Sequence, residues 1–409
     1  MSASVTGSGL PAAGRFALAA ALVSSFGQTF FIGLYGSDFR TAFGLDEAGL
    51  GLLYGAATLT SGLLMFWLGA IADHWRLGRA ALLSTGLLVS GALFIGLAGD
   101  LWQLATGLFL VRLGGQGLTG HLAVVAAARY ARRRRGRAVA MASYGFILGE
   151  ATFPLLVALA LGALAWQTVW LIAALFIAVV AMPLLHRLAA GLQSPLEADH
   201  DIGSAPVDVL QRRQLFRHGG FLRVLGVVLV PPVLVTAVFL HQGTLGEIQG
   251  WRLGQVAQGF ILFAALQGLM AFAGGRLIDR FSARFLLRFS LLPAGAAMLG
   301  LALLPPGPSL WLLFAGLGMT AGLNGVISAA VWVELFGTAQ LGLIRGVYAA
   351  LMVVSTAVGP VLLGGLLAAD VPLLALGSVL FAYAAIIPAL LVPGIGGFEA
   401  ENKISGSRA

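Results

Sequence analysis

Residues 69–79 read GAIADHWRLGR, a short charged segment between two long apolar runs. A related segment, GRLIDRFSAR, stands at residues 275–284. In each segment a Gly precedes an Asp by four residues, and basic residues follow at the end of an apolar run. The two segments are separated by half the chain, so they indicate an internal duplication.

The composition is typical of a polytopic membrane protein. Of the 409 residues, 59% are hydrophobic and 10% are charged, and the mean hydropathy is +0.95, whereas soluble domains carry roughly 25% charged residues. Gly contributes 57 residues, which suits helices that pack closely in lipid. Cys is absent and Lys403 is the only Lys, which excludes Cys ligands, a Walker A loop and a Schiff-base lysine in a span. We expect no cofactor, no metal site and no enzymatic activity.

The apolar runs predict an all-α membrane protein with twelve transmembrane helices, each near the ~20 residues that a bilayer requires. The expected spans are 16–36, 46–72, 79–98, 101–127, 138–162, 166–185, 221–243, 253–275, 285–304, 309–335, 346–368 and 372–393.

The basic residues orient these spans. With the N-terminus inside, all 24 Lys and Arg residues except Arg40, Arg112 and Arg252 fall in cytoplasmic segments, as the positive-inside rule requires. The Arg-rich stretch 129–137 resembles a nucleic-acid patch, but between two spans it is expected to bind anionic lipid headgroups, with no nucleic-acid partner. The predicted location is the inner (plasma) membrane, with both termini cytoplasmic.

The duplication extends beyond the charged segments, because Leu101-Trp102 matches Leu310-Trp311 and Gln116-Gly117 matches Asn324-Gly325 at nearly the same offset. This predicts two pseudo-symmetric six-helix bundles in parallel orientation. The expected domains are a tail (1–14), the N-terminal bundle (15–185), a cytoplasmic linker (186–220), the C-terminal bundle (221–393) and a second tail (394–409).

The two charged segments resemble the signature of the major facilitator superfamily, G-x-x-x-D-[RK]-x-G-[RK]-[RK], which stands between spans two and three and, more weakly, between spans eight and nine. The first copy matches at Gly69, Asp73 and Arg79, with His74 in place of the first basic residue and Gly78 two residues late. The second matches at Gly275, Asp279, Arg280 and Arg284, with Ser282 in place of Gly.

This resemblance implies the twelve-helix fold of the superfamily and a gating role for these seven residues. In the family, the Asp of the first copy approaches the end of span eleven and helps to hold an outward-open state. The alternative is that Asp73 only caps a helix end, where a carboxylate is favoured.

Two ionisable residues, Arg112 and Glu150, are expected deep in spans, where each costs about 2.5–3.5 kcal/mol on insertion scales. They are the main candidates for a substrate and proton site, and a structural ion pair is the alternative. Span five carries Gly149-Glu150 where drug/proton antiporters of the family usually have Gly-Pro. This departure, with the stretch 112–117, resembles bacterial carriers related to monocarboxylate and oxalate/formate transporters.

Four polar residues are further candidates for the site, as ligands or as hydrogen-bond links between helices: Gln28, Gln116, Tyr144 and Asn324. His241 follows the Pro231-Pro232 pair near the outer end of span seven. It is a candidate pH sensor, and a solvated interface residue is the alternative.

The preferred function is secondary active transport of a small solute by alternating access, as proton-coupled symport of a small organic anion. A proton-coupled antiporter that exports drugs or metabolites is the first alternative, and a non-transport membrane scaffold or enzyme is a remote one. The expected partners are a small-molecule substrate, protons and membrane lipids, and the protein is expected to be a monomer.

Overall fold

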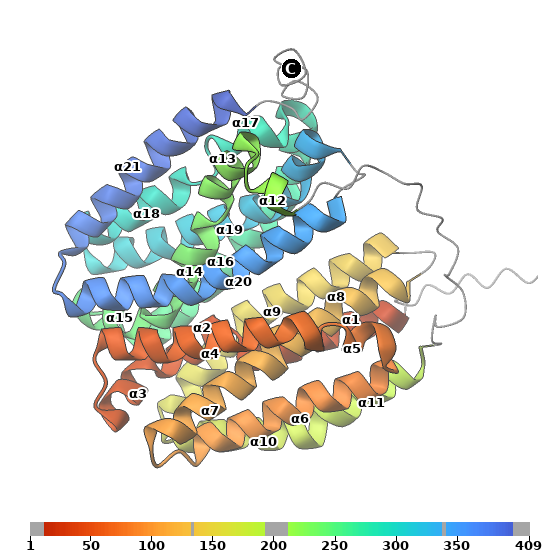
Figure 1. The fold of residues 1–409 in the computed structure, drawn as a ribbon. Helices are drawn as coiled ribbons and strands as arrows, with labels where there is room; N and C mark the ends of the chain where they lie inside the picture. The colour runs from red at the N-terminus through yellow and green to blue at the C-terminus, as the bar shows by residue number, and fades with distance from the viewer. Residues whose placement is uncertain (1–11, 132–134, 193–211, 338–340, 396–409) are drawn as a thin grey trace, which may run out of the picture. The chain divides into compact units, whose positions relative to one another are not determined.

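The computed structural model describes residues 12–131, 135–192, 212–337 and 341–395, and it is all-helical over these ranges (Figure 1). Within these ranges, eleven helices are long and apolar enough to cross a membrane, or twelve if the bent pair Ala12–Gly27 and Thr29–Phe43 forms one span. The predicted all-α membrane fold is therefore confirmed. The predicted tails at 1–11 and 396–409, and linker residues 193–211, lie outside the described residues.

The helices form two compact units, which are described separately. The first comprises Met1–Gln28, Thr60–Gly149 and Leu164–Ile202, and the second comprises Thr29–Leu59, Glu150–Ala163 and Gly203–Ala409. The helices α4 (Glu47–Leu68) and α9 (Arg135–Leu161) contribute to both. The bundle bounds 15–185 and 221–393 stay a prediction.

The described part of the first unit contains three interrupted spans. Its elements are α1 (Ala12–Ser24), η1 (Ser25–Gly27), α5 (Ile71–His74), α6 (Leu77–Gly96), α7 (Leu101–Val111), η3 (Arg112–Thr119), α8 (Gly120–Arg129), α10 (Trp166–Phe176), η4 (Ile177–Ala181) and α11 (Met182–Ala190). Here η1 is a 3-10 turn, and η3 and η4 are π-helical segments.

Small side chains let the helices of the first unit approach closely. A buried cluster made only of alanines joins α1, α8 and α9, with packing from Tyr130 and Leu192 at its edge. Large apolar side chains point outward instead: Trp67 and Trp102 are 72% and 83% exposed. Such exposure fits lipid contact, because soluble monomers rarely expose large apolar patches.

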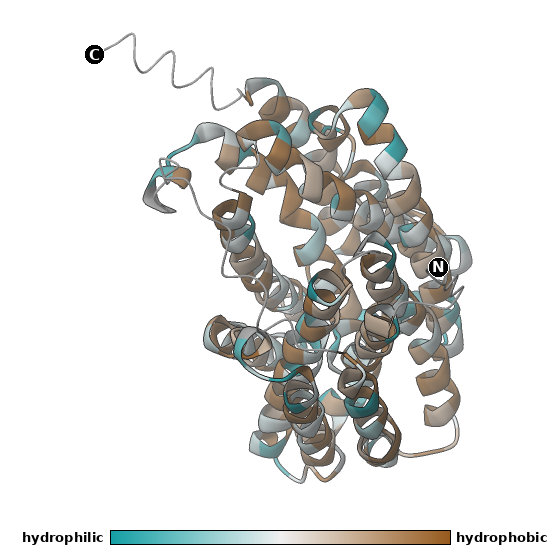
Figure 2. Cartoon of the chain, turned by 90° about the vertical axis from the view of Figure 1, so that its right-hand side faces the viewer, coloured by the Kyte–Doolittle hydropathy of each residue, from teal (hydrophilic) through white to brown (hydrophobic). Residues whose placement is uncertain are grey.

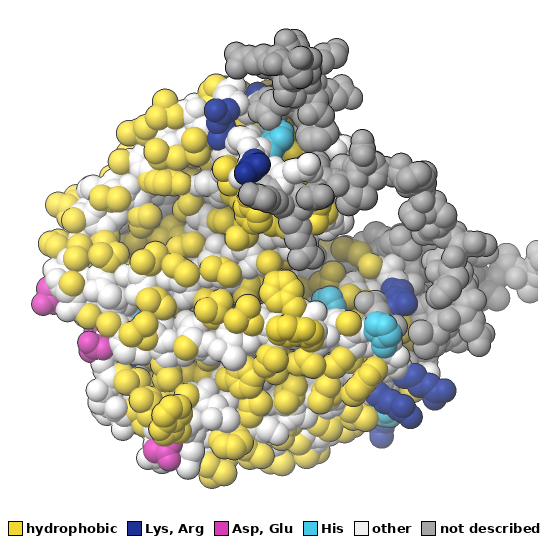
Figure 3. Space-filling view, viewed as in Figure 1, with side chains coloured by type: hydrophobic (Ala, Val, Ile, Leu, Met, Phe, Trp, Pro, Cys, Tyr) yellow, Lys and Arg dark blue, Asp and Glu magenta, His cyan; other side chains and the backbone are white. Residues whose placement is uncertain are grey.

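The distribution of polar residues agrees with this environment. Apolar residues run along the helices in Figure 2, and polar residues gather near some helix ends. In Figure 3, hydrophobic side chains cover the surface over α6, α10 and α11, and basic side chains cluster at the end of these helices near α5.

The second unit contains the longest helices. Its elements are α2 (Thr29–Ile32), η2 (Gly33–Tyr35), α3 (Gly36–Phe43), α12 (Arg212–Leu215), α13 (Gly219–Val228), α14 (Val230–Leu240), α15 (Gln242–Gln249), α16 (Leu253–Phe281), α17 (Ala283–Leu287), α18 (Leu292–Leu303), α19 (Pro306–Phe336), α20 (Leu341–Ala368), α21 (Leu373–Leu391) and η5 (Val392–Gly394).

Aromatic rings fill the core of this unit in two places. The Phe239 ring lies 4.7 Å from Phe260 and 5.0 Å from Phe263, so it joins α14 to α16. Near the opposite end of span seven, Phe221 of α13 lies 5.2 Å from Trp332 of α19. Such pairs add about 0.5–1.5 kcal/mol beyond the area that they bury.

The second charged segment bends at Ser282, between α16 and α17. Its φ is 72° and its ψ is 153°, a region in which essentially only Gly is found and which costs another residue about 1–3 kcal/mol. Its hydroxyl accepts a hydrogen bond from the Phe285 amide at 3.2 Å and so caps α17. The residue that departs from the family signature is thus the one at which the chain adopts a glycine conformation.

We expect Ser282→Gly to raise the stability of the protein by about 1 kcal/mol, because it removes the strain and Gly at an N-cap costs only a few tenths. The measurement is thermal unfolding of purified protein in detergent. The matched control is Ser143→Gly at an exposed helical position of α9, which should lower the stability. An unchanged or lower unfolding temperature for Ser282→Gly would contradict the strain.

Candidate functional site

The first span is interrupted where it faces the π-helical segment of span four. The 3-10 turn η1 ends at Gly27, and Gln28 is extended, with φ −86° and ψ 153°. The segment η3 begins at Arg112 and contacts η1. Interrupted helices and π segments are frequent at functional sites of membrane transporters and enzymes.

Arg112 stabilises this interruption. Its side chain is buried, and Nη1 donates a hydrogen bond to the carbonyl oxygen of Gly27 at 3.0 Å. A helix break removes regular partners from backbone groups, and in a bilayer each unsatisfied group costs several kcal/mol. Arg112 therefore places a positive charge at the break and donates a hydrogen bond to the Gly27 carbonyl there.

Glycine makes the close approach possible. A Cβ atom on Gly27 would overlap the carbonyl oxygen of Val111 and lie 2.8 Å from the Cα of Gly115. Gly115 has the same constraint, with the Gly27 backbone N 2.8 Å from its own hypothetical Cβ. The Gly-Gly-Gln-Gly stretch in span four thus has a packing role.

Two of the predicted polar residues lie at this break. Gln28 is the extended residue itself, and the backbone N of Gln116 lies 3.0 Å from the Cβ position of Gly27. The Oε1 atom of Gln116 is enclosed and has no hydrogen-bond partner among the described residues. Tyr144 is 58% exposed on α9. The structure thus brings Gln28, Arg112 and Gln116 together.

Asn324 lies in the second unit and has the equivalent role there. Pro232 has no N–H, so it cannot pair the carbonyl four residues earlier, that of Val228. The Nδ2 atom of Asn324 donates to this carbonyl oxygen at 3.3 Å. In each unit, a polar side chain of span four or ten pairs a carbonyl at the interruption of span one or seven. This recurrence supports the internal duplication.

Glu150 stands in α9 directly after Gly149, which packs against Ser25 of η1. Its Oε2 atom is enclosed and has no hydrogen-bond partner among the described residues. Arg112 belongs to the first unit and Glu150 to the second, and the pairing of the two side chains stays a prediction.

A cluster of charged residues in the second unit links α3, α4 and α15. Nη1 of Arg40 lies 2.7 Å from Oε1 of Glu47, and its Nη2 lies 3.2 Å from Oε2 of Glu247. His241 is only 1% exposed, and its Nδ1 lies 3.1 Å from Oε2 of Glu47. The alternative that His241 is a solvated interface residue is therefore wrong. We call Arg40, Glu47, His241 and Glu247 the charged cluster.

The first charged segment contacts span four. Nη1 of Arg129 donates to the carbonyl oxygen of Ala72 at 3.4 Å, next to Asp73 in α5. The side chain of Asp73 lies outside what the structure describes. Gly69 stands just before α5, and Arg79 is exposed in the first turn of α6.

The second charged segment is bound by a residue that we did not predict. Gly275, Asp279 and Arg280 continue α16, and the amides of Ala283 and Arg284 donate to the carboxylate of Glu334 at 2.7 and 3.1 Å. A carboxylate is favoured at a helix N-terminus. The sequence signal for Glu334 is an acid at the end of span ten among basic loops.

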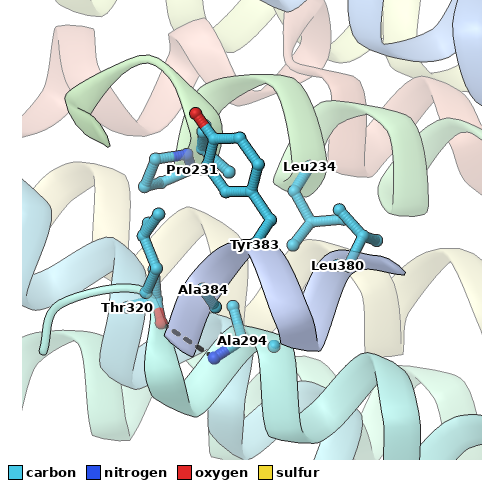
Figure 4. A pocket seen from close by; sticks show the side chains of 10 residues that line it. Pro231, Leu234, Ala294, Thr320, Leu380, Tyr383 and Ala384 are labelled. Atoms are coloured by element: carbon cyan, nitrogen blue, oxygen red, sulfur yellow. Dashed lines mark hydrogen bonds between the residues drawn. The ribbon is translucent and has the colours of Figure 1, made fainter. Parts of the chain in front are cut away.

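A small apolar cavity lies beside the interruption of span seven (Figure 4). Its volume is about 10 Å³, near the ~10–15 Å³ that a single water needs. Pro231, Leu234 and Tyr383 line it, and the Tyr383 hydroxyl donates to the carbonyl oxygen of Gly226 at 2.6 Å. The cavity is too small for an organic substrate.

Comparisons with known proteins agree with this architecture. The family model described as Major Facilitator Superfamily matches residues 17–360. The crystal structure of the nucleoside transporter NupG is similar, with a TM-score of 0.69 and 12% identity, over 93% of this chain and 98% of that one.

A second similar structure is a bacterial homolog of the human lysosomal transporter Spinster, in an inward-facing and occupied conformation. Its TM-score is 0.64 at 17% identity, over 93% of this chain and 90% of that one. No curated protein matches the sequence.

We expect Gly27→Ala to lower the stability by about 1–3 kcal/mol, the usual cost of overpacking, because the new methyl group would overlap the Val111 carbonyl. The control is Gly86→Ala in α6, where nothing lies within 4 Å of the Cβ position; it should be neutral or stabilising. If Gly27→Ala and the unmodified protein unfolded at the same temperature, spans one and four would have to lie farther apart than the contact of Gly27 with Val111 requires.

Proposed function

The chain belongs to the major facilitator superfamily, whose members are transporters and not enzymes, and we propose that it carries a small organic anion together with protons. The observation that carries this proposal is the buried guanidinium of Arg112 at the interruption of span one. Interrupted spans are where transporters commonly bind ions and substrates.

The charge of Arg112 favours an anionic substrate. A guanidinium stays protonated in proteins, and its planar fork can bind a carboxylate through two parallel hydrogen bonds. Gln28 and Gln116 stand at the same break and can donate or accept further hydrogen bonds. The resemblance to carriers related to monocarboxylate and oxalate/formate transporters supports the same substrate class.

Glu150 is the proposed proton acceptor. A carboxylate in a span is costly when it is charged and unpaired, so it favours a proton. We propose that Glu150 pairs with Arg112 when the site is empty, and that an arriving anion takes the guanidinium while Glu150 takes a proton. This order would couple anion and proton movement in one direction.

The remaining predictions complete this proposal. The carrier would lie in the inner (plasma) membrane as a monomer, with both termini cytoplasmic and with lipid headgroups against residues 129–137. Asp73 would stabilise the outward-open state through the helix end of span eleven. Arg129, which bonds Ala72 beside it, supports a role of this segment in gating.

Arg112→Lys should weaken substrate binding about tenfold or more, because an ammonium keeps the charge but loses a charge-assisted hydrogen bond of the fork. A thermal-shift screen against carboxylates, amino acids, sugars, nucleosides and drugs first identifies a ligand, and titration then measures its affinity. The control is Arg252→Lys at the exposed start of α16. Unchanged affinity for every ligand found would place Arg112 outside the site.

Glu150→Gln mimics the protonated acid, so it should bind and exchange substrate across liposomes yet lose accumulation driven by a pH gradient. Counterflow and uphill uptake of the ligand from the screen measure the two properties separately. The control is Asp100→Asn, another acid-to-amide change, at a helix N-cap that Asn serves equally well. A Glu150→Gln protein that still concentrates substrate with only a pH difference rules out this coupling. Uptake that requires an opposite pH gradient would favour the antiporter.

A further inference from the structure

Both ring nitrogens of His241 face hydrogen-bond acceptors. The Nε2 atom lies 3.0 Å from the carbonyl oxygen of Pro360 in α20, and Nδ1 lies 3.1 Å from Oε2 of Glu47 in α4. A carbonyl oxygen can only accept, so Nε2 must carry a hydrogen. A neutral imidazole has one N–H, so Nδ1 would then present a lone pair to a carboxylate. The observed geometry needs one more proton.

We infer that His241 and Glu47 form a proton-binding site, in which one added proton holds α4 and α20 to the end of span seven. The ligand of this site is a proton, bound where no solvent reaches the ring. The contacts of this site do not involve Glu150. The inference rests on the proposed function in one respect: it assumes that the contact of α4 and α20 with His241 opens and closes during transport.

The neighbouring groups place the proton on the imidazole. Arg40 of α3 lies 2.7 Å from Glu47, and Thr244 of α15 also donates to that carboxylate. Arg40 also forms an ion pair with Glu247 of α15. Because Arg40 is permanently charged and several donors point at Glu47, we assign the added proton to Nδ1 of His241, which then donates to this carboxylate.

The proposed proton site lies where the backbones of α4 and α20 pack closely against each other. A Cβ on Gly364 of α20 would overlap the Glu47 carbonyl and lie 3.0 Å from Cε1 of His241. One turn or more along α4, the Cβ position of Gly51 lies 2.5 Å from the Pro360 carbonyl, and that of Gly55 lies 2.9 Å from the Ala357 carbonyl. Loss of the proton sets a lone pair against a carboxylate at this contact, so α4 and α20 should separate as the pH rises.

The sequence contains no Cys, so one introduced thiol reports on this contact. Ala357→Cys is the reporter, because Ala357 is buried against Gly55. Purified protein in detergent is labelled with a maleimide, and the rate is divided by that of the exposed Ala369→Cys to remove the pH dependence of the thiol. The normalised rate should rise about fivefold or more from about pH 5.5 to about pH 8.5, which bracket the titration of histidine.

Glu47→Gln distinguishes a proton site from a purely structural contact. The Gln amide can donate to Nδ1 of a neutral His241 and its oxygen can still accept from Arg40, so the reporter should stay protected at every pH. Val361→Cys, which also contacts Gly55, is the second reporter if Ala357→Cys does not fold.

Each outcome of this assay decides the inference. A normalised rate that does not change with pH, or a rise that persists in Glu47→Gln, overturns it. The labelling assay needs no substrate, so the His241–Glu47 inference can hold even if Glu150→Gln disproves the symport mechanism. Conversely, a negative labelling result does not affect the symport mechanism.

Discussion

A carbonyl group at a helix break inside a bilayer must find a donor, and this requirement organises both units of the protein. The hydrocarbon core offers no bulk water, so the protein itself has to supply the donor, and in both units a side chain does so. Arg112 supplies it to Gly27 in the first span, and Asn324 supplies it to Val228 in the seventh. In both units, interruption and donor lie on spans that correspond under the duplication.

The number and approximate limits of the spans could be predicted from the sequence, because about twenty apolar residues between charged loops have few other structures available to them. The interruptions could be predicted less well. Pro231 and Pro232 marked one of them, since proline removes a donor. The break at Gln28 carries no such signal, because the neighbouring Gly27 packs against Val111 and Gly115, which stand more than 80 residues away along the chain.

The charged cluster shows the limit of reading residues singly. His241 stands out in the sequence only as a His near a span end, which favours solvent. Its partners Glu47 and Pro360 lie 194 and 119 residues away along the chain. Only the packing of α4, α14 and α20 reveals that the ring is buried and paired. Glu334 was missed for the same reason, because it caps a helix that begins 51 residues earlier.

The π-helical segment of span four changes the phase of that helix. Each residue of an α-helix advances by about 100° around the axis, and a π turn spaces its hydrogen bonds one residue wider. The side-chain faces of α7 and α8 therefore belong to two different helical wheels. Leu104 and Ala127, both buried, would be placed about 140° apart, and so on different faces, by a single wheel drawn over Leu101–Arg129. The effects of substitutions in α7 and in α8 therefore have to be plotted on separate helical wheels, and Arg112 stands where the first wheel ends.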